Sequence, residues 1–155
     1  MLKKLIKQIP VLRNLAIIIY KHTLFNATNY WDSRYLEGGD SGRGSYGRLA
    51  EFKANILNKI IDSYKITSIC EFGCGDGENL KLYQIEDYTG YDVSDKIIND
   101  NKLKFSGFKF LNYNRDYECR AYDCTISFDV IYHLVSKGDY KLYLDRLFSL
   151  QKNMC

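Results

Sequence analysis

The chain is poor in the residues that build metal centres and in the residue that breaks helices. Its 155 residues include one proline, two histidines and five cysteines, and no two cysteines form a C-x-x-C pair. A zinc site is therefore not expected, and neither is any other metal centre. The odd number of cysteines, without a recognisable signal peptide, indicates reduced thiols and a cytoplasmic location.

Membrane-spanning hydrophobic runs and a strong overall charge are also missing. Hydrophobic residues make up 46% of the chain and charged residues 26%, which is typical of a soluble globular protein, and the length favours one domain. The net charge is +3, but the first 31 residues hold five basic residues and no acid, so the remainder carries −2. Because that remainder lacks a basic surface, no nucleic-acid partner is expected.

The basic N-terminus forms a segment of its own, residues 1–28. Its apolar residues recur at steps of three and four with lysines opposite, which predicts an amphipathic helix. These residues are Leu2, Leu5, Ile6, Ile9, Leu12, Leu15, Ala16 and Ile19. Pro10 should end or kink the helix, so two short helices are expected. Two roles stay open: the segment packs on the domain, or residues 1–20 contact a membrane surface.

The centre of the sequence is residues 66–80, where a short apolar run meets three alternating glycines. Residues 66–72 predict a buried parallel strand. Gly73, Gly75 and Gly77 then allow a tight turn and a close approach of the backbone to a ligand. The polar residues that follow predict a helix start. A strand, a glycine turn and a helix N-terminus together indicate a nucleotide-binding corner.

A glycine-rich segment precedes this corner. Residues 29–52 begin with aromatic and charged residues and hold five glycines between positions 38 and 47. This composition predicts a mobile loop, either a lid over a ligand site or a plain surface connector. The aromatic residues favour the lid, since aromatics in a loop usually cover something. Residues 49–64 predict a helix that leads into the strand.

After the corner, apolar runs alternate with helical patterns. A short helix is expected around residues 80–83. The predicted strands are residues 87–93, 108–111 and 123–128, and the predicted helices are residues 95–104 and 139–150. Ser94 with Asp95 should cap the first of these two helices. Strands separated by helices in this rhythm predict a parallel, doubly wound α/β sheet.

The glycine spacing distinguishes two kinds of nucleoside site. A dinucleotide turn, G-x-G-x-x-G, needs glycine at position 78, where Glu78 stands, so a nicotinamide-dependent oxidoreductase is disfavoured. The chain instead has E-x-G-x-G-x-G, starting at Glu71. Asp92 follows 19 residues after Gly73, at the end of the next predicted strand. A carboxylate there can accept hydrogen bonds from both hydroxyls of a ribose. Both kinds of nucleoside site need such a carboxylate.

The sequence resembles the class I S-adenosylmethionine-dependent methyltransferases in four motifs that follow the family's order. They are SGRGSYGRLAEFK (41–53), EFGCGDG (71–77), GYDVS (90–94) and DCTISFDVIYHL (123–134). The resemblance spans about residues 29–148 and implies S-adenosylmethionine as cofactor and a Rossmann-like sheet with strand order 3-2-1-4. The methyltransferase domain would occupy residues 29–155.

The family's domain normally has seven strands, and the sequence predicts only four of them. The resemblance therefore implies an incomplete, C-terminally truncated member that lacks the last three strands. Its fourth strand would be an exposed sheet edge with unpaired backbone groups. A partner chain could pair with that edge.

The resemblance also implies a set of cofactor-binding residues. They are Ser45, Tyr46, Glu71, Gly73, Cys74, Gly75, Gly77, Asp92, Val93, Asn114 and Asp129. The methionine part would lie over Gly73 and Gly75, with Glu71 near its ammonium group. Asp92 would hold the ribose, and Val93 would lie against adenine.

The remaining residues of this set are assigned to the adenine, to the methionine end and to the loop over the cofactor. The adenine amino group would meet Asn114 or, with a small shift, Asp116. Asp129 would sit beside the methionine end, because it follows the fourth strand directly. Ser45 and Tyr46 could close over the cofactor. These contacts are the ones that the structure has to place.

The acceptor is expected to be a small molecule, with a sugar or glycan precursor suggested by the bacterial subgroup that the glycine-rich segment resembles. His133 is the candidate for taking a proton from a hydroxyl acceptor, and its alternative role is to cap or pack the turn after the fourth strand. Tyr30, Trp31, Tyr46 and Tyr132 could wall the acceptor pocket. Two hypotheses stay open: methyl transfer, or a non-catalytic remnant that binds the cofactor weakly or acts as an interaction module.

Overall fold

The computed structural model describes residues 14, 26–116, 118–134 and 136–152 of the chain. Four strands form one sheet in the order β3-β2-β1-β4, and every pair of neighbours is parallel. The strands are β1 (Ser68–Phe72), β2 (Asp87–Asp92), β3 (Lys109–Asn112) and β4 (Cys124–Ile126). The α/β class, the parallel sheet and the strand order expected from the sequence are confirmed.

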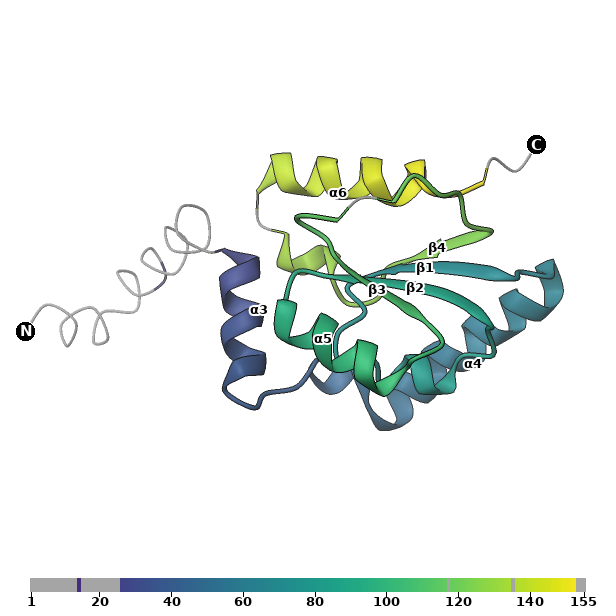
Figure 1. Cartoon of the computed structure of the whole chain (residues 1–155), viewed down its shortest axis with the longest axis horizontal. Helices are drawn as coiled ribbons and strands as arrows, with labels where there is room; N and C mark the ends of the chain where they lie inside the picture. The colour runs from purple at the N-terminus through teal and green to yellow at the C-terminus, as the bar shows by residue number, and fades with distance from the viewer. Residues whose placement is uncertain (1–13, 15–25, 117, 135, 153–155) are drawn as a thin grey trace, which may run out of the picture.

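Helices cover both faces of this sheet (Figure 1). They are α3 (Ala27–Leu36), α4 (Gly47–Tyr64), α5 (Asp95–Lys104) and α6 (Lys137–Ser149). Three single 3-10 turns accompany them: η2 (Arg43–Ser45), η3 (Leu80–Leu82) and η4 (Ile131–His133). α4 and α5 share one core with the sheet, α6 packs on the opposite face, and α3 packs beside α5. This is the layered arrangement of a doubly wound fold.

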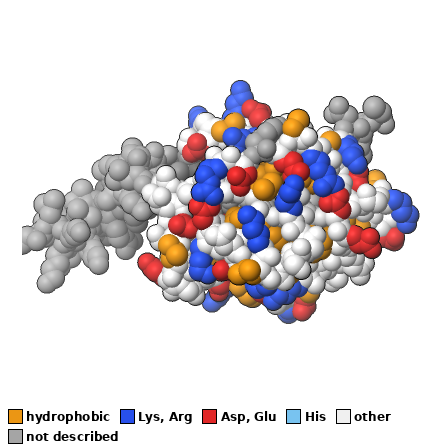
Figure 2. All heavy atoms as spheres, viewed as in Figure 1, with side chains coloured by type: hydrophobic (Ala, Val, Ile, Leu, Met, Phe, Trp, Pro, Cys, Tyr) orange, Lys and Arg blue, Asp and Glu red, His pale blue; other side chains and the backbone are white. Residues whose placement is uncertain are grey.

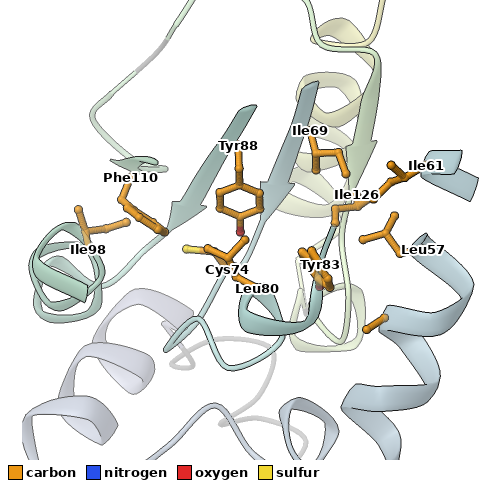
Figure 3. Packing of buried hydrophobic residues seen from close by; sticks show 11 residues of the cluster. Leu57, Ile61, Ile69, Cys74, Leu80, Tyr83, Tyr88, Ile98, Phe110 and Ile126 are labelled. Atoms are coloured by element: carbon orange, nitrogen blue, oxygen red, sulfur yellow. The ribbon is translucent and has the colours of Figure 1, made fainter. Parts of the chain in front are cut away.

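The first core lies between the sheet and the helices α4 and α5 (Figure 3). Because side chains alternate along a strand, Ile69 of β1 faces this core while Cys70 and Phe72 face α6. The core gathers residues from both helices and all four strands: Leu57, Ile61, Ile69, Tyr88, Ile98, Phe110 and Ile126. This packing fixes the end of β1, from which the glycine turn leaves.

The second core is largely aromatic and joins α6 to the sheet. Phe72 lies at its centre, with the rings of Tyr91, Tyr113 and Tyr143 approaching edge-on at centroid distances of 5.2, 5.5 and 5.6 Å. Such edge-to-face pairs add to the stabilisation from buried area. The Tyr143 hydroxyl also donates a hydrogen bond to the carbonyl of Phe72 at 3.2 Å. α6 is thereby held over the carboxyl end of β1.

Several element boundaries differ from those predicted. The mobile loop expected over residues 29–52 is mostly helical, because α3 and α4 occupy both its ends and leave only residues 37–46, the α3–α4 loop, between them. The side chain of Asn26 caps α3 by accepting from the Asn29 amide at 2.9 Å. α6 starts at residue 137 instead of 139, since Ser136 caps it. The short helix expected after the glycines is the single turn η3.

The N-terminal segment, residues 1–28, lies almost entirely outside the described residues. Its two helices and its contact with a membrane surface stay predictions. Within the described residues no helix is long and apolar enough to cross a bilayer. On the face shown in Figure 2, acidic and basic side chains are interspersed. The expectation of no nucleic-acid partner stays a prediction.

β4 forms one edge of the four-stranded sheet. A single parallel bridge places Gln151 beside Tyr122, just before β4. The Tyr122 amide donates to the Leu150 carbonyl at 2.7 Å, and the Lys152 amide donates to the Tyr122 carbonyl at 2.8 Å. No other strand within the described residues pairs with this edge. The pairing of the edge with a partner chain stays a prediction.

Asp123 ties the start of β4 to the start of β1. Its Oδ2 accepts hydrogen bonds from the amide and hydroxyl of Thr67 and from the amide of Ser68, at 2.7 to 3.0 Å. Its Oδ1 accepts from Lys152 Nζ at 2.7 Å. The Lys152 ammonium and the Thr67 donors hold the pKa of the Asp123 carboxyl well below its usual range. This carboxylate therefore acts as a pH-dependent tie between two neighbouring strands.

The substitution Asp123→Asn is expected to lower the free energy of unfolding by about 1–3 kcal/mol at neutral pH, since hydrogen bonds to a charged group are lost. The folded-state pKa of Asp123 is lowered. Its contribution is therefore fully present above the unfolded value of about 3.9 and is lost as the pH falls through the folded-state pKa. Urea denaturation of both proteins across this pH range measures the difference.

The matched control is Asp62→Asn, which removes the fully exposed partner of Lys65. It should change stability very little. An Asp123→Asn effect as small as the control, or one that stays undiminished in acid, would contradict the role of Asp123.

Candidate functional site

A cleft opens at the carboxyl ends of β1, β2 and β4, the edge at which open α/β sheets bind their ligands. It holds about 710 Å³ of free space, its open mouth included. Its lining residues come from α3, the α3–α4 loop, the glycine turn, the strand ends and α6. They are Ala27, Trp31, Tyr35, Ser41, Ser45, Gly73, Gly75, Asp92, Val93, Tyr113, Phe128, Asp129, Val130, His133, Leu134 and Tyr143.

The glycine turn follows β1 and forms the floor of this cleft. Gly73, Gly75 and Gly77 have φ values of 80°, 52° and 76°, which lie in the left-handed region that favours glycine. The amides of Gly73 and Cys74 both donate to the carbonyl of Tyr91, at 2.7 and 3.0 Å. These bonds tie the turn to the end of β2. The close backbone turn predicted from the sequence is therefore present.

The glycines are also needed for packing within the protein. A Cβ on Gly75 would lie 2.3 Å from Ser41 Oγ of the α3–α4 loop. A Cβ on Gly77 would lie 2.5 Å from the ring of Phe105, so Gly77 makes room for a side chain of the first core's periphery. Cys74 is buried in the first core. Of the glycine motif, Gly73 and Gly75 line the cleft, whereas Cys74 and Gly77 do not.

Asp92 ends β2, and its carboxylate lies in the cleft although only 7% of the residue is exposed. Oδ2 accepts from the Gly75 amide and Oδ1 from the Ser94 amide, both at 3.0 Å. Burial raises the pKa of this carboxyl, and the two amides oppose that shift. Each carboxylate oxygen has a second lone pair, so Asp92 can accept further hydrogen bonds from a ligand. Val93, the next residue, adds apolar surface to the cleft.

Asp129 lies at the cleft after β4, with a φ of 60°. Aspartate visits this left-handed region more readily than most residues. Lys53 of α4 donates to its Oδ2 at 2.7 Å, and only 15% of the Lys53 side chain is exposed. A Cβ on Gly44 of the α3–α4 loop would lie 2.3 Å from the same oxygen. The carboxylate is thus held between α4 and the loop.

His133 lies in η4 and lines the cleft. Its ring packs edge-on against Trp31, with centroids 5.1 Å apart. Burial lowers the pKa of His133, and the charge of Asp129 opposes this shift. The imidazole is therefore uncharged near neutral pH and can accept a proton. His133 therefore packs on α3 and also lines the cleft, and its role as proton acceptor stays a prediction.

Glu71 does not line the cleft. It is 2% exposed and accepts hydrogen bonds from the hydroxyls of Tyr88 at 2.6 Å and Tyr83 at 3.4 Å. Burial raises its pKa to about 7, against the effect of these two donors. The side chain points into the first core because it alternates with Phe72, which faces α6. Its contact with an ammonium group stays a prediction.

The two residues considered for the adenine contact also lie outside the cleft. Asn114 Nδ2 donates to Thr28 Oγ1 of α3 at 2.9 Å, and Asp116 Oδ2 accepts from the Asn112 amide at 2.8 Å. Both side chains are used to fold the segment after β3. Tyr113 lines the cleft in their place.

Two residues of the α3–α4 loop line the cleft, and only one of them was predicted from the sequence. Ser45 lines the cleft as expected, and so does Ser41. Tyr46 lies outside it, because its hydroxyl donates to Asp76 Oδ2 at 2.5 Å. Of the four aromatic residues expected in the wall, only Trp31 is there.

Sequence reasoning missed most of the aromatic wall. Tyr113 directly follows β3 and Phe128 lies two residues after β4, so their position past a strand end was a usable signal. Tyr35 and Tyr143 had no such signal, since they reach the cleft only through the packing of α3 and α6. Within the described residues, no group of three or more His, Cys, Asp or Glu side chains could hold a metal ion.

The arrangement fits a nucleoside with a cationic end. Asp92 offers acceptor capacity for hydroxyl groups, and Asp129 offers a negative charge. Neither Gly73 nor Gly75 carries a side chain that would obstruct the floor. The buried carboxylate of Asp92 disfavours a phosphate beside it, because the like charges would repel each other.

Comparison with known proteins identifies the family. The sequence matches the family described as methyltransferase domain over residues 41–153, which includes all four strands and the glycine turn. No curated protein matches the sequence significantly.

Several solved structures share the fold. The N-methyltransferase NodS from Bradyrhizobium japonicum WM9, in complex with S-adenosyl-L-homocysteine, has a TM-score of 0.65 at 18% identity, over 82% of this chain and 69% of NodS. CalS10, an amino pentose methyltransferase from Micromonospora echinaspora bound to SAM, has 0.60 at 12%, over 84% and 54%. The sugar N-methyltransferase KedS8 from Streptoalloteichus sp ATCC 53650 has 0.60 at 15%, over 77% and 49%.

The chain thus spans about half the length of CalS10 and KedS8. At these identities the neighbours establish the fold alone, whereas the family match covers most of the sequence. Together they support S-adenosylmethionine as the cofactor for a cleft of this composition. On the extent of the family match, the chain belongs to the methyltransferase domain family.

Proposed function

We propose that the protein binds S-adenosylmethionine in the cleft and transfers its methyl group to a small-molecule acceptor. The observation that carries this proposal is Asp92, a buried carboxylate with unused lone pairs beside the side-chain-free floor at Gly73 and Gly75. Two ribose hydroxyls are donors that match this acceptor. The apolar surface of Val93 lies next to it, where a base attached to the ribose can pack.

Asp129 is the second polar anchor of the proposed site. Its carboxylate is fixed by Lys53 and by the close approach of Gly44. The α-amino group of an amino acid is an ammonium, and it can donate a hydrogen bond to the Asp129 carboxylate. The two acids thus give the cleft one anchor for each end of a nucleoside joined to an amino acid.

The bound cofactor supplies a methyl group made electrophilic by a sulfonium. The protein then has to hold the acceptor in line with that methyl group and take up its proton. His133 lies in the same cleft and has a lowered pKa, so it is uncharged at neutral pH. Its edge-on packing against Trp31 fixes the ring. We assign it the role of proton acceptor.

The acceptor we propose is a sugar or an amino sugar. Two neighbours in fold, CalS10 and KedS8, are named as an amino pentose and a sugar N-methyltransferase. The walls of the cleft combine aromatic side chains, among them Trp31 and Tyr113, with the carboxylates of Asp92 and Asp129. Such walls bind small polar molecules through a few placed polar groups.

One observation favours a second function. The chain spans 54% of the length of CalS10 and 49% of the length of KedS8. The alternative is a protein that binds the cofactor weakly without methyl transfer, or that acts as an interaction module.

Two measurements test these functions. Calorimetric titration with S-adenosylhomocysteine should show binding, and labelled S-adenosylmethionine should methylate members of a panel of sugars and amino sugars. Binding without transfer to any panel member would favour the alternative. A lack of binding at millimolar ligand would defeat both forms of cofactor binding.

The substitution Asp92→Asn is expected to weaken S-adenosylhomocysteine binding by about 10- to 100-fold, since hydrogen bonds to a charged acceptor contribute about 1.5–3 kcal/mol. Calorimetry measures the dissociation constants. Asp100→Asn, which removes the exposed partner of Lys96 on α5, controls for the loss of one charge. Thermal unfolding controls for the structural bond from Asp92 to the Gly75 amide. An Asp92→Asn affinity equal to that of the control would remove Asp92 from the site.

The assignment of His133 predicts a pH profile. Because its folded-state pKa lies below the ordinary 6.5, the rate should be constant at neutral pH and fall only as the pH drops through that lower value. His133→Asn should reduce the turnover rate by about 100-fold and abolish this limb. Initial rates with the acceptor found in the panel measure both effects. A full turnover rate with an unchanged pH profile would show that His133 only packs. The control is Tyr132→Phe, a substitution of the exposed neighbouring residue, which should keep the wild-type rate and pH profile.

A further inference from the structure

We infer that Asp76, inside the glycine turn, is a positioning residue that latches the α3–α4 loop over the cleft and thereby sets the rate at which a ligand leaves. The identity of that ligand, a nucleoside, rests on the proposed function. The latch itself rests on contacts within the chain.

Asp76 and Ser41 bond reciprocally. The Ser41 amide donates to Asp76 Oδ2 at 2.9 Å, and the Asp76 amide donates to Ser41 Oγ at 2.8 Å. The hydroxyl of Tyr46 donates to the same Oδ2 at 2.5 Å. One carboxylate oxygen therefore holds the loop at Ser41 and again at its junction with α4. Hydrogen bonds to an ionised acceptor are stronger than those between neutral groups.

The latch determines what the loop presents to the cleft. Ser41 Oγ also bonds Tyr35 at 3.0 Å and sits directly over Gly75, where a Cβ would lie 2.3 Å away. Ser41 and Ser45 both line the cleft. The wall that the loop contributes is therefore positioned by Asp76, whose own side chain does not line the cleft.

Three glycines give the loop backbone conformations that other residues rarely adopt. Gly38, Gly42 and Gly47 have positive φ values, and a Cβ on any of them would meet nothing within 4 Å. These glycines therefore serve backbone conformation instead of packing, as expected at hinges. Asn79 adds a longer bond, from Nδ2 to Ser45 Oγ at 3.5 Å. The strongest polar ties between the loop and the glycine turn are those to Asp76.

Two consequences follow for a ligand in the cleft. With the latch closed, Ser41 and Ser45 form one wall of the cleft, and a ligand that packs against this wall is held more loosely once the loop opens. Weakening the latch should therefore speed both loop opening and ligand release, although Asp76 does not contact the ligand.

Limited proteolysis tests the latch without any ligand. Arg43 is exposed in the loop, so trypsin cleavage after it reports how often the loop opens. Asp76→Asn should raise the cleavage rate about tenfold, because the bonds from Ser41 and Tyr46 lose their charged acceptor. Asp100→Asn should cleave at the wild-type rate. Equal rates for Asp76→Asn and the wild type would overturn the latch.

Ligand release is the second readout. The dissociation rate of S-adenosylhomocysteine, followed by stopped flow, should rise about tenfold in Asp76→Asn and less in Tyr46→Phe, which removes one of the three bonds. A wild-type dissociation rate in both variants would show that Asp76 does not set the rate of ligand release. Thermal midpoints close to the wild type show that the variants are folded, and Tyr46→Phe serves if Asp76→Asn is not. If the wild type binds no S-adenosylhomocysteine, the proposed function fails while the proteolysis still decides the latch.

Discussion

The turn after β1 can form only if three alternate residues adopt positive φ and carry no side chain, and the rest of the cleft depends on this constraint. Gly75 shows both requirements: its φ is 52°, and Ser41 occupies the space of its missing Cβ. The backbone amide of Gly75 also donates a hydrogen bond to Asp92. The turn therefore connects the acid that ends β2 with the loop that closes the cleft, so a side chain at Gly75 would displace both.

A second constraint is that the polar groups of the site are held by partners distant in sequence. Asp129 keeps its place through Lys53, which lies 76 residues earlier. Asp76 is held through Ser41, 35 residues earlier. Such pairs bring α4, the loop and the segment after β4 to one edge of the sheet. Because loops joined only by their own backbone would be mobile, these long-range pairs give the cleft a defined shape.

These distances explain what could be predicted from the sequence. Strand periodicity, capping at Ser94 and the acid at Asp92 are local patterns, so the parallel sheet and the place of Asp92 at the end of β2 followed from the sequence, whereas the strand order came from the family resemblance. The helix α3 was hidden by the glycines that follow it, although Asn26 carried a capping signal. Lys53 and Tyr143 had no local pattern, since each reaches the site only through helix packing. For Glu71 the motif gives the position in β1, whereas its hydrogen bonds with Tyr83 and Tyr88 come from packing in the first core.

The electrostatics of the cleft are set by packing as well as by charge. Asp129 alone would raise the pKa of His133, yet the pKa is lowered because burial outweighs the acid. The imidazole and Trp31 rings form an edge-to-face pair with centroids 5.1 Å apart, and burial of this kind disfavours the charged form of histidine. Trp31 of α3 and Tyr132 of η4 both contact the imidazole and have no charge at neutral pH. The protonation of His133 therefore depends on how it is packed as well as on Asp129.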